Sequence, residues 1–199
     1  MLEIKNLTEI TSNGLCIGCG LCQSVVGKEK IQISMTDKGR LEPRETTSLS
    51  NEDFRKIKEI CPGVLVEGLP KKEISKNSKE DLIWGVYNSL YYAWSSDKDI
   101  RLQSSTGGLL NGISLYLLET NKVDFILHTA GDPDKPMRSI PKFSYSKEDL
   151  LNCESRSRYG PASPLSKFNE ALDKNKNFAF IGKPCDISAI RLLSKTDKR

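Results

Sequence analysis

Three cysteines near the N-terminus have the spacing of an iron–sulfur ligand loop. Cys16, Cys19 and Cys22 form the pattern C-x2-C-x2-C, with glycines at positions 18 and 20. Three thiolates at this spacing can wrap one face of a cluster, and the glycines let backbone N–H groups approach the sulfur atoms. The pattern therefore predicts a [4Fe–4S] cluster.

Such a cluster needs a fourth thiolate. In two-cluster ferredoxins the next cysteine follows three residues on and precedes proline, but this chain has Val26 at that position. A Cys-Pro pair occurs instead at Cys61-Pro62. One cluster bound by Cys16, Cys19, Cys22 and Cys61 is the simplest interpretation. A structural zinc site is the alternative, although zinc sites usually pair two separate C-x2-C turns.

A small-residue loop, Ser104-Ser105-Thr106-Gly107-Gly108, precedes an apolar segment that we expect to be a helix. Hydroxyl groups and unhindered backbone N–H groups at a helix N-terminus can bind an anion such as a flavin pyrophosphate. The chain has neither a G-x-G-x-x-G fingerprint nor a Walker loop. A simple helix cap is the alternative interpretation.

A second turn, Gly182-Lys183-Pro184-Cys185-Asp186, follows an expected strand and opens a helix. Lys183 and the helix N-terminus favour a thiolate at Cys185, which could ligate metal, carry out redox chemistry or simply pack. We expect Cys153 to pack and His128 to be structural. We also expect the core to contain Trp84, Tyr91, Tyr92 and Trp94.

The elements that must position these groups fall into two parts. In the first part, alternation over 31–35, a turn at 37–39 and a return at Leu41 predict a hairpin. Ser50 and Asp53 form a capping-box pattern that begins a helix ending at Cys61-Pro62. In the second part we expect strands and helices to alternate, with strands at 86–94, 123–130, 138–145 and 178–182 and helices at 109–119, 163–172 and 187–194. Ser146 and Asp149 are expected to cap another short helix.

Composition excludes several classes of protein. The net charge of +4 comes from 30 basic and 26 acidic residues that are interspersed, so we expect no nucleic-acid partner. Apolar runs are too short to cross a bilayer, and the N-terminus has no secretory pattern, which predicts a cytoplasmic protein. In that reducing compartment the six cysteines are not expected to form disulfides.

Three segments in order resemble the beta subunit of coenzyme F420 hydrogenase/dehydrogenase. They are the loop at 104–108, Ser157-Arg158-Tyr159-Gly160-Pro161-Ala162, and the turn at 182–187. The resemblance covers about residues 85–195, and the cysteine module resembles the one that precedes this domain in many relatives. It implies a noncovalent FAD fed by iron–sulfur clusters, and two-electron exchange with a deazaflavin or another organic acceptor.

By position, the resemblance implies a set of site residues. The flavin residues would be Ser104, Ser105, Thr106, Gly107, Gly108, Arg158, Tyr159 and Lys183, and Cys185 would help to hold a second cluster. Lys183 departs from the threonine that is usual in this family.

The expected architecture is an α+β ferredoxin-like iron–sulfur module (1–70), a linker (71–84) and an α/β flavin domain with a mainly parallel sheet (85–199). We expect the last to be incomplete, because the family's domain continues with more cysteines. The expected function is that of an oxidoreductase subunit passing electrons between a [4Fe–4S] cluster, FAD and coenzyme F420 or a similar acceptor. Its expected partner is a ferredoxin-like donor or a hydrogenase or dehydrogenase subunit. The alternative is a non-catalytic ferredoxin-like carrier or adaptor.

Overall fold

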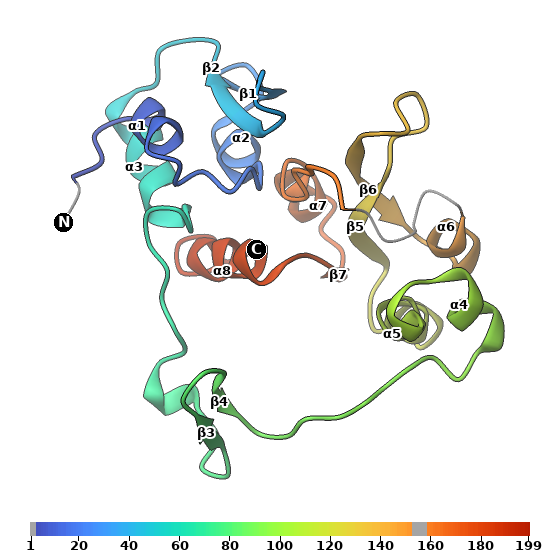
Figure 1. Cartoon of the computed structure of the whole chain (residues 1–199). Helices are drawn as coiled ribbons and strands as arrows, with labels where there is room; N and C mark the ends of the chain where they lie inside the picture. The colour runs from blue at the N-terminus through green and yellow to red at the C-terminus, as the bar shows by residue number, and fades with distance from the viewer. Residues whose placement is uncertain (1–2, 153–158) are drawn as a thin grey trace.

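The computed structural model describes residues 3–152 and 159–199 (Figure 1). Its N-terminal part consists of short helices around one hairpin. In chain order the elements are α1 (Leu7–Ser12), α2 (Leu21–Val26), β1 (Ile31–Met35), β2 (Leu41–Glu45) and α3 (Asn51–Ile60).

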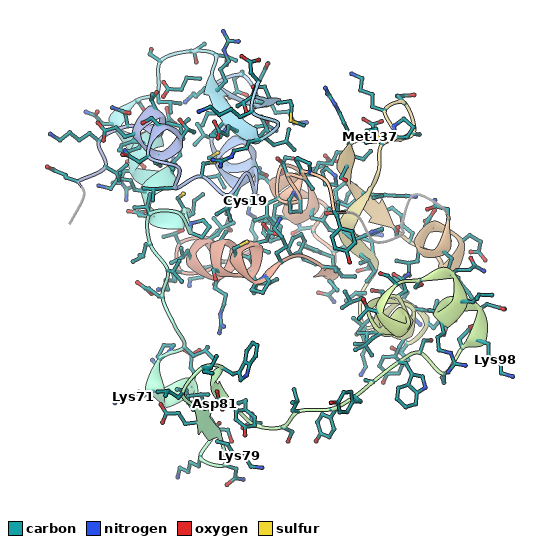
Figure 2. All side chains as sticks on the ribbon, in the orientation of Figure 1. Cys19, Lys71, Lys79, Asp81, Lys98 and Met137 are labelled. Carbon is teal, nitrogen blue, oxygen red and sulfur yellow. The ribbon has the colours of Figure 1, made fainter. Side chains whose placement is uncertain are left out.

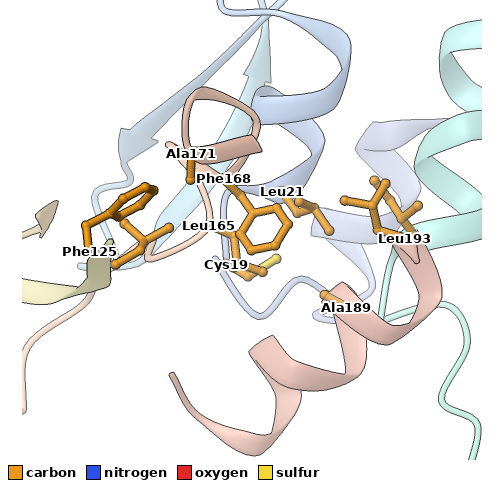
Figure 3. Packing of buried hydrophobic residues seen from close by; sticks show 10 residues of the cluster. Cys19, Leu21, Phe125, Leu165, Phe168, Ala171, Ala189 and Leu193 are labelled. Atoms are coloured by element: carbon orange, nitrogen blue, oxygen red, sulfur yellow. The ribbon is translucent and has the colours of Figure 1, made fainter. Parts of the chain in front are cut away.

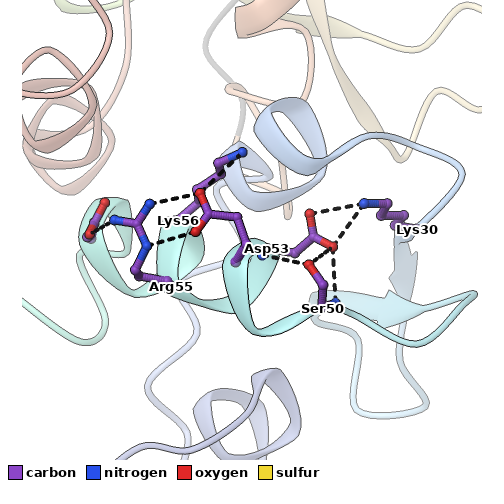
Figure 4. Close-up of polar contacts among 7 residues, drawn as sticks. Lys30, Ser50, Asp53, Arg55 and Lys56 are labelled. Carbon is purple, nitrogen blue, oxygen red and sulfur yellow. Dashed lines mark hydrogen bonds and ion pairs between the residues drawn. The ribbon is translucent and has the colours of Figure 1, made fainter.

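The predicted hairpin and the predicted capped helix of this part are confirmed, and the ferredoxin-like module stays a prediction. Strands β1 and β2 pair antiparallel, with Met35 opposite Leu41, and Gly39 adopts a φ of +74° in the turn. Ser50 and Asp53 form the expected capping box at the start of α3. Lys30 ties the hairpin to this cap, because its Nζ lies 2.9 Å from a carboxylate oxygen of Asp53 (Figure 4).

A compact apolar core supports the cysteine loop from the N-terminal side. Its buried residues come from the N-terminal segment, α1, β1 and α3, and Cys16, Cys22 and Cys61 pack against it. The buried residues of this core are Ile4, Leu7, Ile10, Ile31 and Ile57.

The middle of the chain lies away from the N-terminal core described above (Figure 1). It contains a 3-10 turn, η1 (Lys71–Glu73), and a hairpin of β3 (Lys79–Asp81) and β4 (Gly85–Tyr87). The predicted buried strand at 86–94 is therefore wrong, because only 86–87 lie in a strand and 88–94 lie in no regular element. Side chains along this stretch project into solvent (Figure 2).

The prediction that the four aromatic residues of this segment lie in the core is also wrong. Their side chains are exposed, and Tyr92 reaches 99%. Apolar composition favours burial only where another surface faces the segment, because strand propensity mostly reflects packing against neighbours. The described residues provide no such surface for Trp84, Tyr91, Tyr92 and Trp94.

The C-terminal part contains a three-stranded sheet in the order β6-β5-β7. Strand β5 pairs antiparallel with β6 and parallel with β7, so the described sheet is mixed, and the mainly parallel sheet stays a prediction. The elements are α4 (Lys98–Gln103), η2 (Thr106–Gly108), α5 (Leu109–Glu119), β5 (Phe125–Gly131), β6 (Ser139–Ser144), α6 (Lys147–Leu151), α7 (Phe168–Asp173), β7 (Phe178–Phe180) and α8 (Pro184–Leu193).

A second core joins the two parts. Helix α2 contacts α7, and α3 contacts α8. Cys19 and Leu21 from the cysteine loop share this core with Phe168 of α7 and Ala189 of α8 (Figure 3). The domain boundaries proposed from the sequence stay a prediction, but the cysteine module is packed directly on the C-terminal part.

Within the described residues, no helix combines the length and apolarity required to cross a membrane.

Candidate functional site

The four predicted cluster cysteines line one cavity. Cys16, Cys19 and Cys22 come from the loop before and the first turn of α2, and Cys61 comes from the C-terminal end of α3. Helix α3 ends there and residue 62 is proline, which cannot continue a helix. The rest of the wall is largely apolar, with Leu7, Ile10, Ile33, Ile57 and Ile60 among its residues.

Backbone N–H groups lie beside the sulfur atoms. The N–H of Gly18 donates to Cys16 Sγ at 3.4 Å. The backbone N–H groups of Leu21, Gln23, and Gly63 and Val64 act to lower the pKa of Cys19, Cys22 and Cys61, respectively, against the larger effect of burial. N–H donors to sulfur stabilise negative charge on a thiolate and tune the potential of a cluster.

Burial keeps the four groups as thiols when no metal is bound. It raises the pKa of Cys16, Cys22 and Cys61, and it raises the pKa of Cys19 to about 12. A bound cation inverts this preference, because coordination deprotonates a thiol outright. Cluster binding would therefore release protons.

The four cysteines supply the number of thiolates that a cluster needs. Among residues 3–152 and 159–199, no group of three or more His, Cys, Asp or Glu residues is arranged to hold one metal ion. Four thiols on one cavity wall fit a four-iron cluster, which takes four thiolate ligands. A structural zinc ion takes the same number.

A larger cavity of about 430 Å³ lies in the C-terminal part. Its size falls in the range of small-molecule and cofactor sites, about 300–1,000 Å³. The residues around it come from the loop before α5, the middle of β5, the segment before α7 and the turn after β7. They are Ser104, Ser105, Thr106, Gly108, Leu109, Leu110, Asn111, His128, Thr129, Gly160, Ala162, Pro164, Ile181, Gly182, Lys183 and Asp186.

The loop before α5 has the backbone that an anion cradle needs. Thr106, Gly107 and Gly108 all adopt positive φ angles, and Gly108 is the N-cap residue of α5. A side chain at Gly108 would place its Cβ 2.9 Å from the carbonyl oxygen of Ile100, so glycine is required there. The amide of Asn111 donates to Ser104 Oγ at 2.7 Å and holds the two cavity residues together.

The turn after β7 contributes both a cation and a carboxyl group. The backbone N–H of Lys183 donates to Asp186 Oδ2 at 2.9 Å, and the Lys183 ammonium lies 3.3 Å from the same oxygen. Asp186 is fully buried at the third position of α8, where a carboxylate is favoured by the helix dipole.

The structure brings most of the predicted flavin residues together. Ser104, Ser105, Thr106, Gly108 and Lys183 line the cavity. Gly107 belongs to the same loop but does not line the cavity, and a Cβ added at this position would point toward Trp94.

Two other predicted site residues line neither cavity. Tyr159 is 97% exposed, whereas its neighbour Gly160 lines the large cavity. Cys185 is half-buried on α8, so its role as a ligand stays a prediction. Arg158 and Cys153 lie outside the described residues.

Sequence reasoning missed cavity residues from β5 and α8. His128 lines the cavity with Thr129, and its Nε2 lies 2.7 Å from Ser144 Oγ. Desolvation by burial lowers the pKa of His128. The rule that ligands bind beyond the carboxyl ends of parallel strands could have identified this edge, because β5 and β7 are the parallel pair.

One segment contacts both the large cavity and the cysteine loop. Ala162 and Pro164 line the large cavity. Ser163 lies between these two residues, and its Oγ donates to the Gly18 carbonyl at 2.7 Å. Leu165 follows Pro164, and its N–H donates to the Cys19 carbonyl at 2.9 Å. Alternate residues of this segment therefore contact the large cavity and the cysteine loop.

Known proteins share sequence similarity with this chain. The family model described as coenzyme F420 hydrogenase/dehydrogenase, beta subunit N-term, matches residues 90–169. A coenzyme F420-dependent sulfite reductase from Methanocaldococcus jannaschii is 29% identical over 198 residues, which are 97% of this chain and 27% of that protein.

Two beta subunits of coenzyme F420 hydrogenase also match. The one from Methanosarcina barkeri is 30% identical over 56% of this chain and 38% of its own length, and the one from Methanococcus voltae is 26% identical over 56% and 40%. A solved structure of the F420-reducing [NiFe] hydrogenase complex from Methanosarcina barkeri aligns with 52% of this chain and 35% of that chain at 27% identity and a TM-score of 0.47.

The chain spans about a quarter to two fifths of the length of these curated relatives. The resemblance inferred from the sequence is confirmed for the part of the chain that carries its motifs. Residues 90–169 match the model of the N-terminal domain of the coenzyme F420 hydrogenase/dehydrogenase beta subunit family.

Proposed function

We propose that this chain is the electron-transfer part of an F420-linked oxidoreductase. In this proposal Cys16, Cys19, Cys22 and Cys61 hold one [4Fe–4S] cluster, and the 430 Å³ cavity holds the flavin of FAD. When bound, the cluster exchanges single electrons and the flavin pairs them for two-electron exchange with coenzyme F420 or a similar organic acceptor.

The observation that carries the proposal is one segment that connects the two cavities. The segment containing Ser163 and Leu165 hydrogen-bonds to the cysteine loop, while Ala162 and Pro164 of the same segment line the large cavity. Two redox cofactors that exchange electrons must lie close together. A segment that lines one cavity and is bonded to the lining of the other is the arrangement expected for such a pair.

The chain's own residues bind and orient the two groups. The loop Ser104–Gly108, at the N-terminus of the 11-residue helix α5, offers hydroxyl and N–H groups to phosphate oxygens. Lys183 adds a positive charge at the cavity wall. Around the cysteines, the apolar wall restricts water, and the Gly18 N–H holds the sulfur atom of Cys16 in place.

Partner proteins are also part of the proposal. Two of the relatives are named as subunits of a hydrogenase. The exposed apolar residues between 82 and 94 give this chain a surface suited to protein contacts, because large apolar patches usually mark interaction sites. We propose a redox subunit or a ferredoxin-like donor as the partner, and the cytoplasm as the location.

Anaerobic purification followed by iron, sulfide and flavin quantification tests the function. We expect about four irons and four sulfides per chain together with bound FAD. A cluster without flavin affinity would favour the alternative, a non-catalytic carrier or adaptor subunit. Zinc without iron would contradict the proposal altogether.

The flavin half has its own variant test. Ser104→Ala removes a cavity hydroxyl, and the expected result is several-fold weaker FAD binding with an unchanged iron content, measured by flavin fluorescence. Ser188→Ala is the matched control, because Ser188 Oγ donates only to the Pro184 carbonyl within α8. Equal FAD affinity in all three proteins would place the flavin elsewhere.

A further inference from the structure

Asp186 lies between the two proposed cofactor sites. It is fully buried, and it is one of the residues lining the 430 Å³ cavity. It also lies on the face of α8 that packs toward the cysteine loop. Ala189, one turn further along the same helix, shares a hydrophobic core with Cys19, and the two lie close together in Figure 3.

The charge of Asp186 is only partly offset. Its Oδ2 is bound by the backbone N–H and the ammonium of Lys183. Its Oδ1 is buried and has no hydrogen-bond partner among the described residues. The side chain of Lys183 is 55% exposed, so water screens the lysine far more than the buried carboxylate.

The cysteine loop lies close to this carboxylate. Ala189, on the same face of α8, packs with Cys19 in one buried core, so protein rather than water fills the space between Asp186 and the loop. A buried negative charge disfavours any further electron placed on a neighbouring group, because like charges repel strongly where little water screens them.

We propose that Asp186 is a potential-setting residue, which lowers the reduction potential of the cluster bound through Cys19, and that Lys183 limits this effect. The proposal rests on the function proposed above. A lower cluster potential strengthens the drive for electrons to leave the cluster toward the flavin cavity.

Two variants with opposite charge changes test this role in the full chain after anaerobic cluster loading. Asp186→Asn removes the negative charge at nearly constant shape, and the expected result is a more positive midpoint potential of the cluster. Lys183→Gln removes the offsetting positive charge, and the expected shift is smaller and toward negative potential. The readout is an EPR-monitored redox titration, which needs neither substrate nor activity.

Glu170→Gln is the matched control. Glu170 lies on α7, which also packs near the cysteine loop, but its side chain is exposed, so water screens the same change of charge. We expect the potential of this variant to equal that of the unmodified chain. An equal shift in Glu170→Gln would show a general charge effect and would overturn the assignment to Asp186.

Unchanged potentials in Asp186→Asn and Lys183→Gln, each with a full complement of iron, would overturn the inference while leaving the proposed function intact. Failure of the unmodified chain to bind iron would overturn both. If Asp186→Asn does not assemble the cluster, the sign of the Lys183→Gln shift decides the matter, since the exposed lysine side chain can be replaced without opening the core.

Discussion

The hydroxyl of Ser163 donates a hydrogen bond of 2.7 Å to the carbonyl oxygen of Gly18, which lies 145 positions earlier in the chain. Both residues are buried, and this contact attaches the cysteine loop to the wall of the large cavity. We expect Ser163→Ala to destabilise the protein by about 1–3 kcal/mol, because it leaves a buried carbonyl group without its donor. Urea denaturation measures this loss.

The stability of Ser188→Ala provides the reference for Ser163→Ala. Its hydroxyl lies on the exposed surface of α8, and we expect its effect to stay within about 0.5 kcal/mol. Equal stabilities of the two variants would mean that the loop is held by apolar packing alone.

Iron content should distinguish the four cysteines that line the cysteine cavity from Cys185. We expect Cys61→Ser to lose most of its bound iron and sulfide, because a four-iron cluster requires the thiolate at the end of α3. Cys185→Ser should keep about four irons per chain, because Cys185 does not line the cysteine cavity. Anaerobic iron and sulfide analysis checks both, and retention of iron by Cys61→Ser would remove Cys61 from the ligand set.

Gly20 is constrained by both its backbone and its neighbours. It has a φ of +83°, and an added Cβ would lie 2.9 Å from Ser166 Cβ and 3.0 Å from Ser163 Cβ. Gly39 has a similar φ of +74°, but its Cβ position is open. We expect Gly39→Ala to cost about 1–2 kcal/mol from backbone strain alone, and Gly20→Ala to cost roughly 1–3 kcal/mol more from overpacking.

Thermal or urea denaturation compares the two glycine variants. Iron content should also fall in Gly20→Ala but not in Gly39→Ala, because only Gly20 lies in the loop between the cysteines. A Gly39→Ala protein as unstable as Gly20→Ala would show that the contact with the 163–166 segment contributes little.

His128 predicts a pH dependence of stability. Desolvation by burial lowers its pKa in the folded state below the value of about 6.5 expected for the unfolded chain. The unfolded state therefore binds a proton more readily, so the stability contributed by neutral His128 is present above about pH 6.5 and is lost as the pH falls through the lowered folded-state pKa. His128 is the only histidine of the chain, so no other histidine contributes to the loss of stability in this pH range.

The control for this prediction is His128→Gln, which can keep a hydrogen bond to Ser144 but does not titrate. Urea midpoints measured between pH 7.5 and 5 should fall for the unmodified chain and change less for the variant. Parallel curves for the two proteins would mean that His128 titrates alike in the folded and unfolded states.

Local patterns in the sequence were sufficient for the parts of the site formed by contiguous residues. The cysteine spacing, the Ser50–Asp53 capping box and the glycine loop before α5 each depend on backbone geometry over a few positions. The structure contains the capping box and the glycine loop at the start of α5, as expected. Thiols from two distant segments also line one cavity, as the Cys-Pro pair at 61–62 indicated.

Tertiary packing alone decided which apolar residues are buried and which buried residues reach the cavities. The aromatic run around Tyr91 and Tyr92 has a composition typical of a core, yet it is exposed because no described segment faces it. His128 and Asp186 are ordinary residues of a strand and a helix by their local sequence. They reach the cavity because β5 pairs with β7 and α8 packs beneath the cysteine loop, which depends on contacts between residues far apart in the chain.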